Sequence, residues 1–190
     1  MSTAAAVERM REASPRLIAR IAGSFYLLAI LVAVFAEFIV PGRLAVPAAI
    51  AIPVLSYAVV TLLLYAIFRP VSPGLALLAV GFQLVGLAFE ALRLQPRGVN
   101  VGMTFHGLYC LLIGYLIFRS TFMPRFLGVL MAFAGLVWLV YLSAPLAKSL
   151  SPYNSAVGLV GEGLPMLWLL LMGVNAQRWK EQATTAEEQR

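Results

Sequence analysis

Six apolar stretches of membrane-spanning length follow one another along this chain and take up most of it. A helix needs about 20 apolar residues to cross the hydrocarbon layer of a bilayer, and each stretch is close to that length. Hydrophobic residues make up 62% of the sequence, whereas soluble domains have roughly 45–50%. The sequence therefore predicts an all-α, polytopic membrane protein, a bundle of six transmembrane helices. The predicted spans are residues 17–40, 47–68, 74–94, 101–118, 126–144 and 157–174.

Polar segments flank this apolar region. Residues 1–16 predict an N-terminal arm and residues 175–190 a tail in water, which leaves 17–174 as a single transmembrane domain. The first apolar run is longer than the ~7–15 residues of a signal-peptide core, so we expect it to be retained as a helix. Six crossings place both termini on one side of the membrane. Most arginines and lysines fall on that side, and the positive-inside rule then predicts that both termini are cytoplasmic.

We attribute the net charge of +6 to the same basic residues at the cytoplasmic ends of the helices. Basic chains can bind nucleic acid, but basic residues also collect at the cytoplasmic ends of membrane helices, so we expect the lipid bilayer as a partner and no nucleic acid. A single cysteine, Cys110, excludes an intrachain disulfide bond. The sequence has no zinc-type spacing of Cys and His residues and no cofactor fingerprint, and we expect neither a metal nor a cofactor.

Glu162 lies inside the last apolar stretch. Placing a carboxylate in hydrocarbon costs about 3 kcal/mol even on lenient scales, which makes such a residue a functional candidate. Gly161 and Gly163 flank it, and Pro165 removes a backbone N–H from the next turn, so local unwinding of this helix is easier. The alternative is that these small residues only allow close packing between helices.

Other polar side chains are predicted at a similar depth, near the outer ends of their helices. Helical spacing puts Gln83, Glu90 and Arg93 on one face of the third span. The only histidine, His106, shares a face of the fourth span with Tyr109 and Cys110. We therefore expect a small polar pocket in the outer half of the bundle, with Glu162, His106 and Glu90 as candidate catalytic groups. The candidate ligand-binding residues are Glu162, Glu37, Glu90, His106, Tyr57, Tyr109, Gln83 and Arg93.

Each of these residues also has a simpler interpretation. Glu90 and Arg93 can form an ion pair at a helix end. Glu37 is close enough to the boundary to reach the headgroups. His106 can bond to a neighbouring carbonyl and have no other role. A metal site made of these glutamates and His106 lacks paired ligand spacing.

Residues 106–130 (HGLYCLLIGYLIFRSTFMPRFLGVL) resemble the best-marked segment of a bacterial membrane family catalogued as domain of unknown function 4386. Glu162 with Trp168 and residues 173–175 resembles its last helix, and residues 20–30 together with residues 36–38 resemble its first. The resemblance implies a six-helix protein of the bacterial inner membrane and no particular activity. Many members have an acid early in the second helix and an Arg-x-x-Glu motif in the third. Here those places hold Ser56 or Tyr57 and the residues 83–86 (QLVG).

Three functions remain open from the sequence. The first is a module that binds or transports a lipophilic or cationic small molecule at Glu162, tuned by Glu37, Glu90 and His106. The second is an intramembrane enzyme that uses acid/base chemistry on an isoprenoid or another lipid. The third is a structural or accessory subunit in which the polar layer specifies helix packing.

Overall fold

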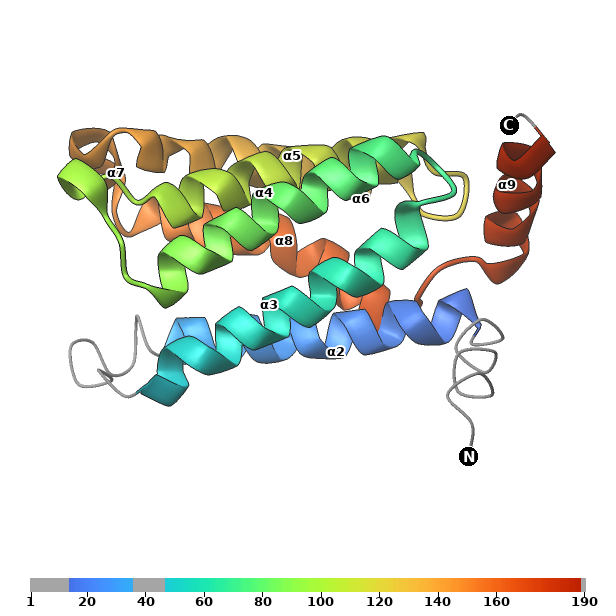
Figure 1. The fold of residues 1–190 in the computed structure, drawn as a ribbon, viewed down its shortest axis with the longest axis horizontal. Helices are drawn as coiled ribbons and strands as arrows, with labels where there is room; N and C mark the ends of the chain where they lie inside the picture. Colours follow the sequence, from blue (N-terminus) through green and yellow to red (C-terminus); the bar gives the residue numbers. More distant parts are fainter. Residues whose placement is uncertain (1–13, 36–46, 189–190) are drawn as a thin grey trace.

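A computed structural model describes residues 14–35 and 47–188 of the chain, so Glu37 lies outside the described residues. Within those residues, six helices are long and apolar enough to cross a membrane, as predicted (Figure 1). These helices are α2 (Pro15–Val34), α3 (Pro47–Phe68), α4 (Pro73–Ala91), α5 (Val101–Arg119), α6 (Arg125–Trp138) together with the 3₁₀ turn that continues it to Leu142, and α8 (Tyr153–Leu171). Shorter elements join or follow them, namely η2 (Pro96–Gly98), η3 (Leu139–Leu142), α7 (Ala144–Leu150) and α9 (Ala176–Glu188).

The helix ends follow local sequence signals. Pro15 and Pro73 occupy the first turns of α2 and α4, where the missing backbone N–H has no intrahelical partner to lose. Asn100 caps α5, because its side-chain oxygen accepts a hydrogen bond from the backbone N–H of Met103 at 3.0 Å. Gly173, just beyond α8, has a φ of +68°, a conformation that favours glycine.

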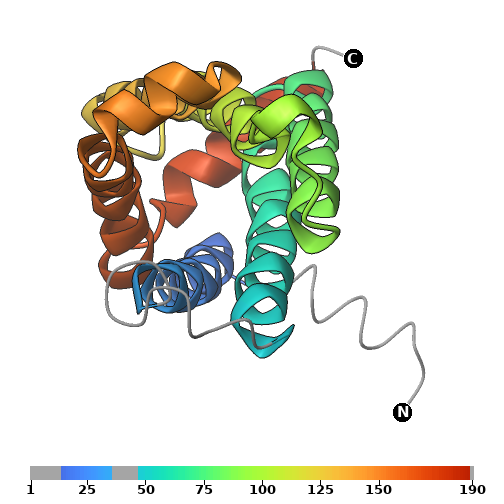
Figure 2. The same cartoon turned by 90° about the vertical axis from the view of Figure 1, so that its left-hand side faces the viewer.

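The six long helices form a closed ring. Each packs against the next one along the chain, and α8 packs against α2 to complete the circle. Figure 2, which looks along the bundle, shows the helices surrounding a common axis. Every ring helix therefore turns one face toward this axis, so residues far apart in sequence meet there.

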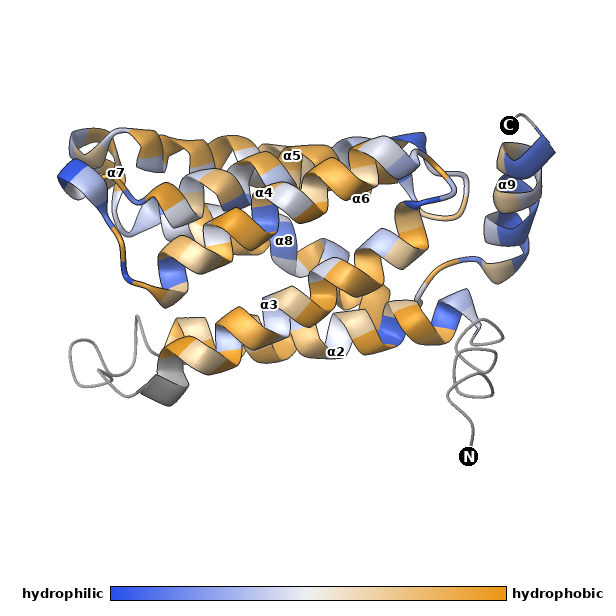
Figure 3. Ribbon diagram, viewed as in Figure 1, coloured by the Kyte–Doolittle hydropathy of each residue, from blue (hydrophilic) through white to orange (hydrophobic). Residues whose placement is uncertain are grey.

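Large apolar side chains cover the outside of the ring. Leu55, Leu77, Phe133 and Val160 are each more than half exposed, on four different helices. Figure 3 shows hydrophobic residues along the length of the ring helices and hydrophilic ones at the ends and on α9. An exposed apolar surface of this extent fits contact with lipid. The chain is a multi-pass membrane protein.

Glycines allow two of the helix pairs to approach closely. In the α5–α6 pair, a Cβ atom added to Gly114 would lie 2.7 Å from the carbonyl oxygen of Gly128. One added to Gly107 would lie 2.9 Å from the carbonyl oxygen of Gly135. In each helix the two glycines are seven residues apart, so they lie on one face. At the α2–α8 contact that closes the ring, a Cβ atom on Gly23 would lie 2.5 Å from the backbone nitrogen of Leu170.

The structure differs from the prediction in the last third of the chain. Residues 145–155, expected as a loop, contain α7 and the first turn of α8. The sixth membrane helix therefore begins at Tyr153, four residues before the predicted start, which places Glu162 deeper than expected. It also continues through Pro165 without interruption, so the local unwinding that the sequence suggested does not occur.

At the end of the bundle opposite α7, α9 runs across the bundle axis (Figure 1). The indole N–H of Trp179 donates to the carbonyl of Ile67 at 2.8 Å and holds this helix against the end of α3. Arg16 and Arg20 of α2 donate to the carbonyls of Met172 and Leu171, the last carbonyls of α8. Cations at a helix C-terminus are favourable because unpaired carbonyls give that end a negative partial charge.

Candidate functional site: a polar centre and its cavity

Every ring helix contributes one polar or aromatic side chain to a cluster inside the ring, which we call the polar centre. Most of these side chains are buried, and Gln83 and Glu162 are among the most completely buried of the described residues. A polar cluster inside an apolar bundle is stable only when its hydrogen bonds are satisfied. The polar centre consists of Tyr26 (α2), Tyr57 (α3), Gln83 (α4), His106 (α5), Trp138 (α6) and Glu162 (α8).

Glu162 is the hub of the polar centre, and it has no exposed surface. Its Oε2 accepts a hydrogen bond of 2.5 Å from the hydroxyl of Tyr26. Its Oε1 accepts a hydrogen bond from the indole N–H of Trp138 and lies 2.9 Å from Nε2 of His106. Four helices therefore meet at this one carboxylate, whose hydrogen-bonding capacity is largely used by protein groups.

His106 joins Glu162 to Gln83. Its Nδ1 lies 3.0 Å from the side-chain oxygen of Gln83. When Nδ1 carries the hydrogen and donates to the amide oxygen, Nε2 of the neutral imidazole is an acceptor that faces a carboxylate oxygen, which is also an acceptor. In that tautomer a proton or a metal ion between the two atoms joins His106 to Glu162.

Packing around His106 fixes its orientation. The ring of Tyr57 meets the imidazole edge-on, with centroids 5.2 Å apart, and meets Tyr26 in the same way at 5.4 Å. Tyr109 lies one turn along α5 and packs against His106 with centroids 5.9 Å apart. Cys110, the next residue, is fully buried, and its Sγ lies 3.6 Å from both Nε2 of His106 and Oε1 of Glu162.

A cavity of about 600 Å³ lies beside the polar centre. Among the described residues, both apolar and polar side chains line it. It extends from the polar centre toward the end of the bundle that carries the 92–100 segment. Glu162 has no exposed surface and is not part of the cavity wall. The polar or aromatic side chains that line the cavity include Tyr57, Gln83, Glu90, Arg93, Gln95, Asn100, His106, Trp138, Tyr141 and Ser155.

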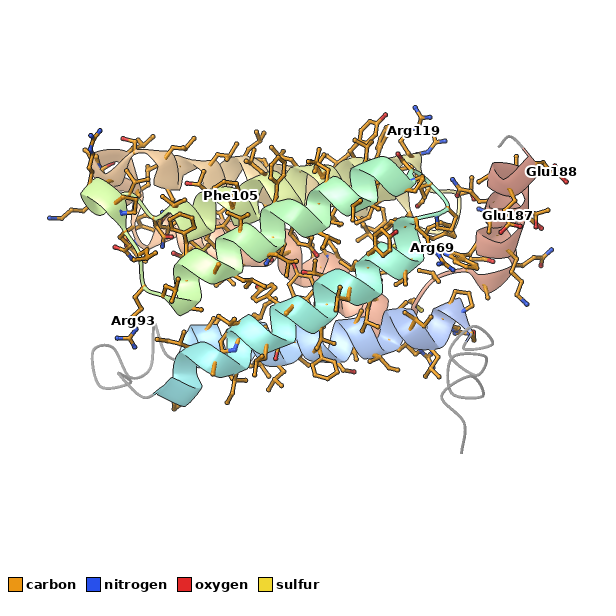
Figure 4. The ribbon with its side chains drawn as sticks, viewed as in Figure 1. Arg69, Arg93, Phe105, Arg119, Glu187 and Glu188 are labelled. Atoms are coloured by element: carbon orange, nitrogen blue, oxygen red, sulfur yellow. The ribbon has the colours of Figure 1, made fainter. Side chains whose placement is uncertain are left out.

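Among the described residues that line this cavity, Glu90 is the acidic one. Its carboxylate packs over Gly102, where a Cβ atom would come within 2.3 Å of Oε1. A glycine at this place is therefore required for the observed position of the carboxylate. Arg93, which the sequence placed on the same face, is exposed at the end of the bundle, opposite the end with Arg69 and Arg119 (Figure 4).

The predicted polar residues fall into two groups. Glu162, His106 and Gln83 are joined by direct contacts in the polar centre. Glu90 is one residue from the end of α4, seven residues after Gln83, and so lies about 10 Å further along this helix. The cavity is lined by Glu90, Gln83 and His106, so it extends between the two groups.

Of the predicted residues, the structure brings together Glu162, His106, Gln83, Tyr57 and Tyr109, and places Glu90 and Arg93 further out along the cavity. Tyr26 and Trp138 were not among the site residues predicted from the sequence. A signal for Trp138 did exist in Gly158. A Cβ atom there would lie 2.5 Å from Cζ2 of the indole, so this glycine leaves the space that the ring occupies.

Comparison with known proteins finds a similar family and a similar protein, and neither has a described activity. The sequence profile of the family described as "Domain of unknown function (DUF4386)" matches residues 90–173, which include Glu90, His106, Trp138 and Glu162. An "Uncharacterized protein" from Archaeoglobus fulgidus is 29% identical over 125 residues, or 60% of this chain and 75% of the relative. No solved structure matches the chain. Over residues 90–173 the chain is therefore similar to the DUF4386 family, and the structure adds six helices long and apolar enough to cross a membrane.

Proposed function

We propose that this protein binds, and in its membrane transports, a small amphipathic molecule with a cationic head, and that the cavity is the binding site. The observation that carries the proposal is the position of Glu90 in a cavity of about 600 Å³ whose remaining wall combines apolar side chains with polar and aromatic ones. Small-molecule sites in proteins have volumes of roughly 300–1,000 Å³ and combine apolar walls with a few polar groups. A carboxylate in such surroundings attracts an organic cation more strongly than it does in water.

The cavity also argues for Glu90 rather than Glu162 as the group that meets a ligand. Both carboxylate oxygens of Glu162 have protein partners, and its side chain has no exposed surface. In this proposal Glu162 holds His106 and Trp138 in the cavity wall. A ligand that fills the cavity touches those two rings, and its positive group faces Glu90.

An acid/base enzyme fits this geometry less well. Gln83 and Glu162 occupy both ring nitrogens of His106, so the imidazole has no free nitrogen to exchange a proton with a substrate. General acid/base catalysis needs its group within hydrogen-bond reach of the reacting atom. These contacts support binding over the enzyme hypothesis.

We further propose that the cavity faces the outside of the bacterial inner membrane and that both termini are cytoplasmic. Arg69 and Arg119 lie at the α9 end of the bundle, opposite the end with Arg93 (Figure 4). The first of these ends is the more basic one in the sequence, and basic loops stay in the cytoplasm.

Binding of tetraphenylphosphonium, a lipophilic cation, to the purified full-length protein tests the function. Trp138 lines the cavity, so quenching of tryptophan fluorescence is a suitable readout. We expect Glu90→Gln to weaken binding about tenfold, the scale of one partly buried charge interaction of ~1.4 kcal/mol. Glu181→Gln, which changes an exposed acid on α9, should leave the affinity unchanged.

Two results would contradict the proposal. One is the absence of saturable binding of the cation by the wild-type protein. The other is equal affinity of the wild-type protein and Glu90→Gln. If Glu90→Gln instead reduces only the amount of folded protein, the role of Glu90 is structural, as expected for an accessory subunit.

A further inference from the structure

We propose that His106, Cys110 and Glu162 form a binding site for a divalent transition-metal ion of the zinc type. The three side chains offer one nitrogen, one sulfur and one oxygen atom, all buried and all within 4.8 Å of one another. This site is distinct from the proposed cation site at Glu90, and neither proposal requires the other.

The distances between the three atoms suit a metal ion. Sγ of Cys110 lies 3.6 Å from Nε2 of His106 and 3.6 Å from Oε1 of Glu162, and the last two atoms are 2.9 Å apart. Three atoms with these separations lie on a circle of radius about 2 Å, close to a Zn–N or Zn–O bond length and slightly below the Zn–S length of ~2.3 Å. An ion near the centre of this circle reaches all three ligands after side-chain shifts of a few tenths of an ångström.

The helices place these ligands without strain. His106 and Cys110 are four residues apart on α5, so they lie on one face, one turn apart. Glu162 comes from α8 on the other side of the ring. Bonds to the remaining atoms of the ligands fix their orientation, with Gln83 on Nδ1 of His106 and Tyr26 on Oε2 of Glu162. Partners of this kind commonly orient metal-binding histidines and carboxylates.

Charge is balanced when the ion is divalent. A thiolate and a carboxylate carry two negative charges, and neutral His106 adds none, so the complex with a divalent ion is neutral. A neutral centre avoids the large cost of an isolated charge inside the membrane. With the hydrogen of His106 on Nδ1, the ion also joins Nε2 to Oε1 of Glu162, which are both acceptors in that tautomer.

The donor set selects the class of metal. Thiolate and imidazole ligands favour zinc, copper and other late transition metals, whereas magnesium and calcium prefer oxygen ligands alone. His106 also lines the cavity, which gives the ion a route from the end of the bundle to the site. Three protein ligands leave room for a fourth ligand, as in zinc sites that also bind water or substrate.

Cobalt(II) is the most direct probe, because a thiolate bound to it gives an intense ligand-to-metal absorption band in the near ultraviolet. The chain contains a single cysteine, so any such band identifies Cys110 as the ligand. The experiment uses the full-length protein, purified with a tag free of histidine and cysteine, treated with a chelator, and titrated with Co²⁺ and then with Zn²⁺. We expect the band to saturate at one Co²⁺ per chain and Zn²⁺ to remove it.

Variants separate the metal site from simple packing. Cys110→Ser should abolish the band, and Glu162→Gln should weaken Co²⁺ binding at least tenfold, the effect of losing ~1.4 kcal/mol or more. Ser56→Ala, which changes a buried hydroxyl outside the polar centre, should bind Co²⁺ as the wild-type protein does. The proposal fails if the folded wild-type protein gives no thiolate band, which would mean that a proton alone joins His106 to Glu162. It also fails if Cys110→Ser retains the band.

Discussion

At the scale of single residues, the polar centre shows how a carboxylate is stabilised inside an apolar bundle. Tyr26 donates to Oε2 of Glu162 at 2.5 Å, and both side chains are almost completely buried. Hydrogen bonds to charged groups contribute about 1.5–3 kcal/mol each, and an unpaired buried oxygen carries a penalty of similar size. The stability of the fold should therefore depend strongly on the partners of this one carboxylate.

Tyr26→Phe should lower the free energy of unfolding by about 1–3 kcal/mol, because it removes the donor to Oε2 and leaves the ring in place. The midpoint of thermal unfolding in detergent measures this effect. Tyr153→Phe is the matched control, since Tyr153 is 74% exposed. Equal unfolding midpoints for the two variants would show that the hydrogen bond to Glu162 adds no stability.

At the scale of helices, glycines determine how closely α8 approaches its neighbours. A Cβ atom on Gly161 would lie 2.9 Å from Cβ of Ala134 and 3.1 Å from the carbonyl oxygen of Leu130 on α6. Around Gly163 nothing lies within 4 Å of such an atom. Two glycines that flank Glu162 in the same way in the sequence thus have different surroundings.

Gly161→Ala should destabilise the protein by about 1–3 kcal/mol, because the added methyl group pushes α8 away from α6. Gly163→Ala should be neutral or stabilising by up to about 1 kcal/mol, since alanine is the better helix former and the space is open. Thermal unfolding of both variants checks the pair. A loss of stability in Gly163→Ala that equals the loss in Gly161→Ala would contradict the described packing of α8.

At the scale of the whole molecule, the two ends of the ring can be told apart by chemical labelling. Lys148 lies on α7 at the cavity end, and Thr185 lies on α9 at the opposite end. With both termini cytoplasmic, a membrane-impermeant maleimide should label Lys148→Cys in intact cells and Thr185→Cys only after permeabilisation. The wild-type protein is the control, because Cys110 is fully buried and should not react. The reverse labelling pattern would invert the proposed orientation.

The sequence predicted the helices well because hydrocarbon imposes a length on each of them. It also predicted that Glu162 and His106 meet, since polar residues in membrane helices face the interior of a bundle. Their depth was harder to predict. The α8 helix begins at Tyr153 because the polar residues Asn154 and Ser155, which looked like a loop, are buried inside it. Trp138 and Tyr26 were missed as donors because an aromatic residue in an apolar helix gives no periodic signal of the face it occupies.

The contact between α2 and α8 that closes the ring has a consequence for how the protein is assembled. Of the six ring helices, α2 is synthesised first and α8 last, so five of them reach the bilayer before the carboxylate of Glu162 exists. Until then Tyr26, His106 and Trp138 lack the carboxylate that they share in the finished protein. Arrival of α8 closes the ring of helices and supplies the carboxylate that these three side chains share. A chain that ends before Glu162 would leave these polar groups inside an open bundle without their common partner.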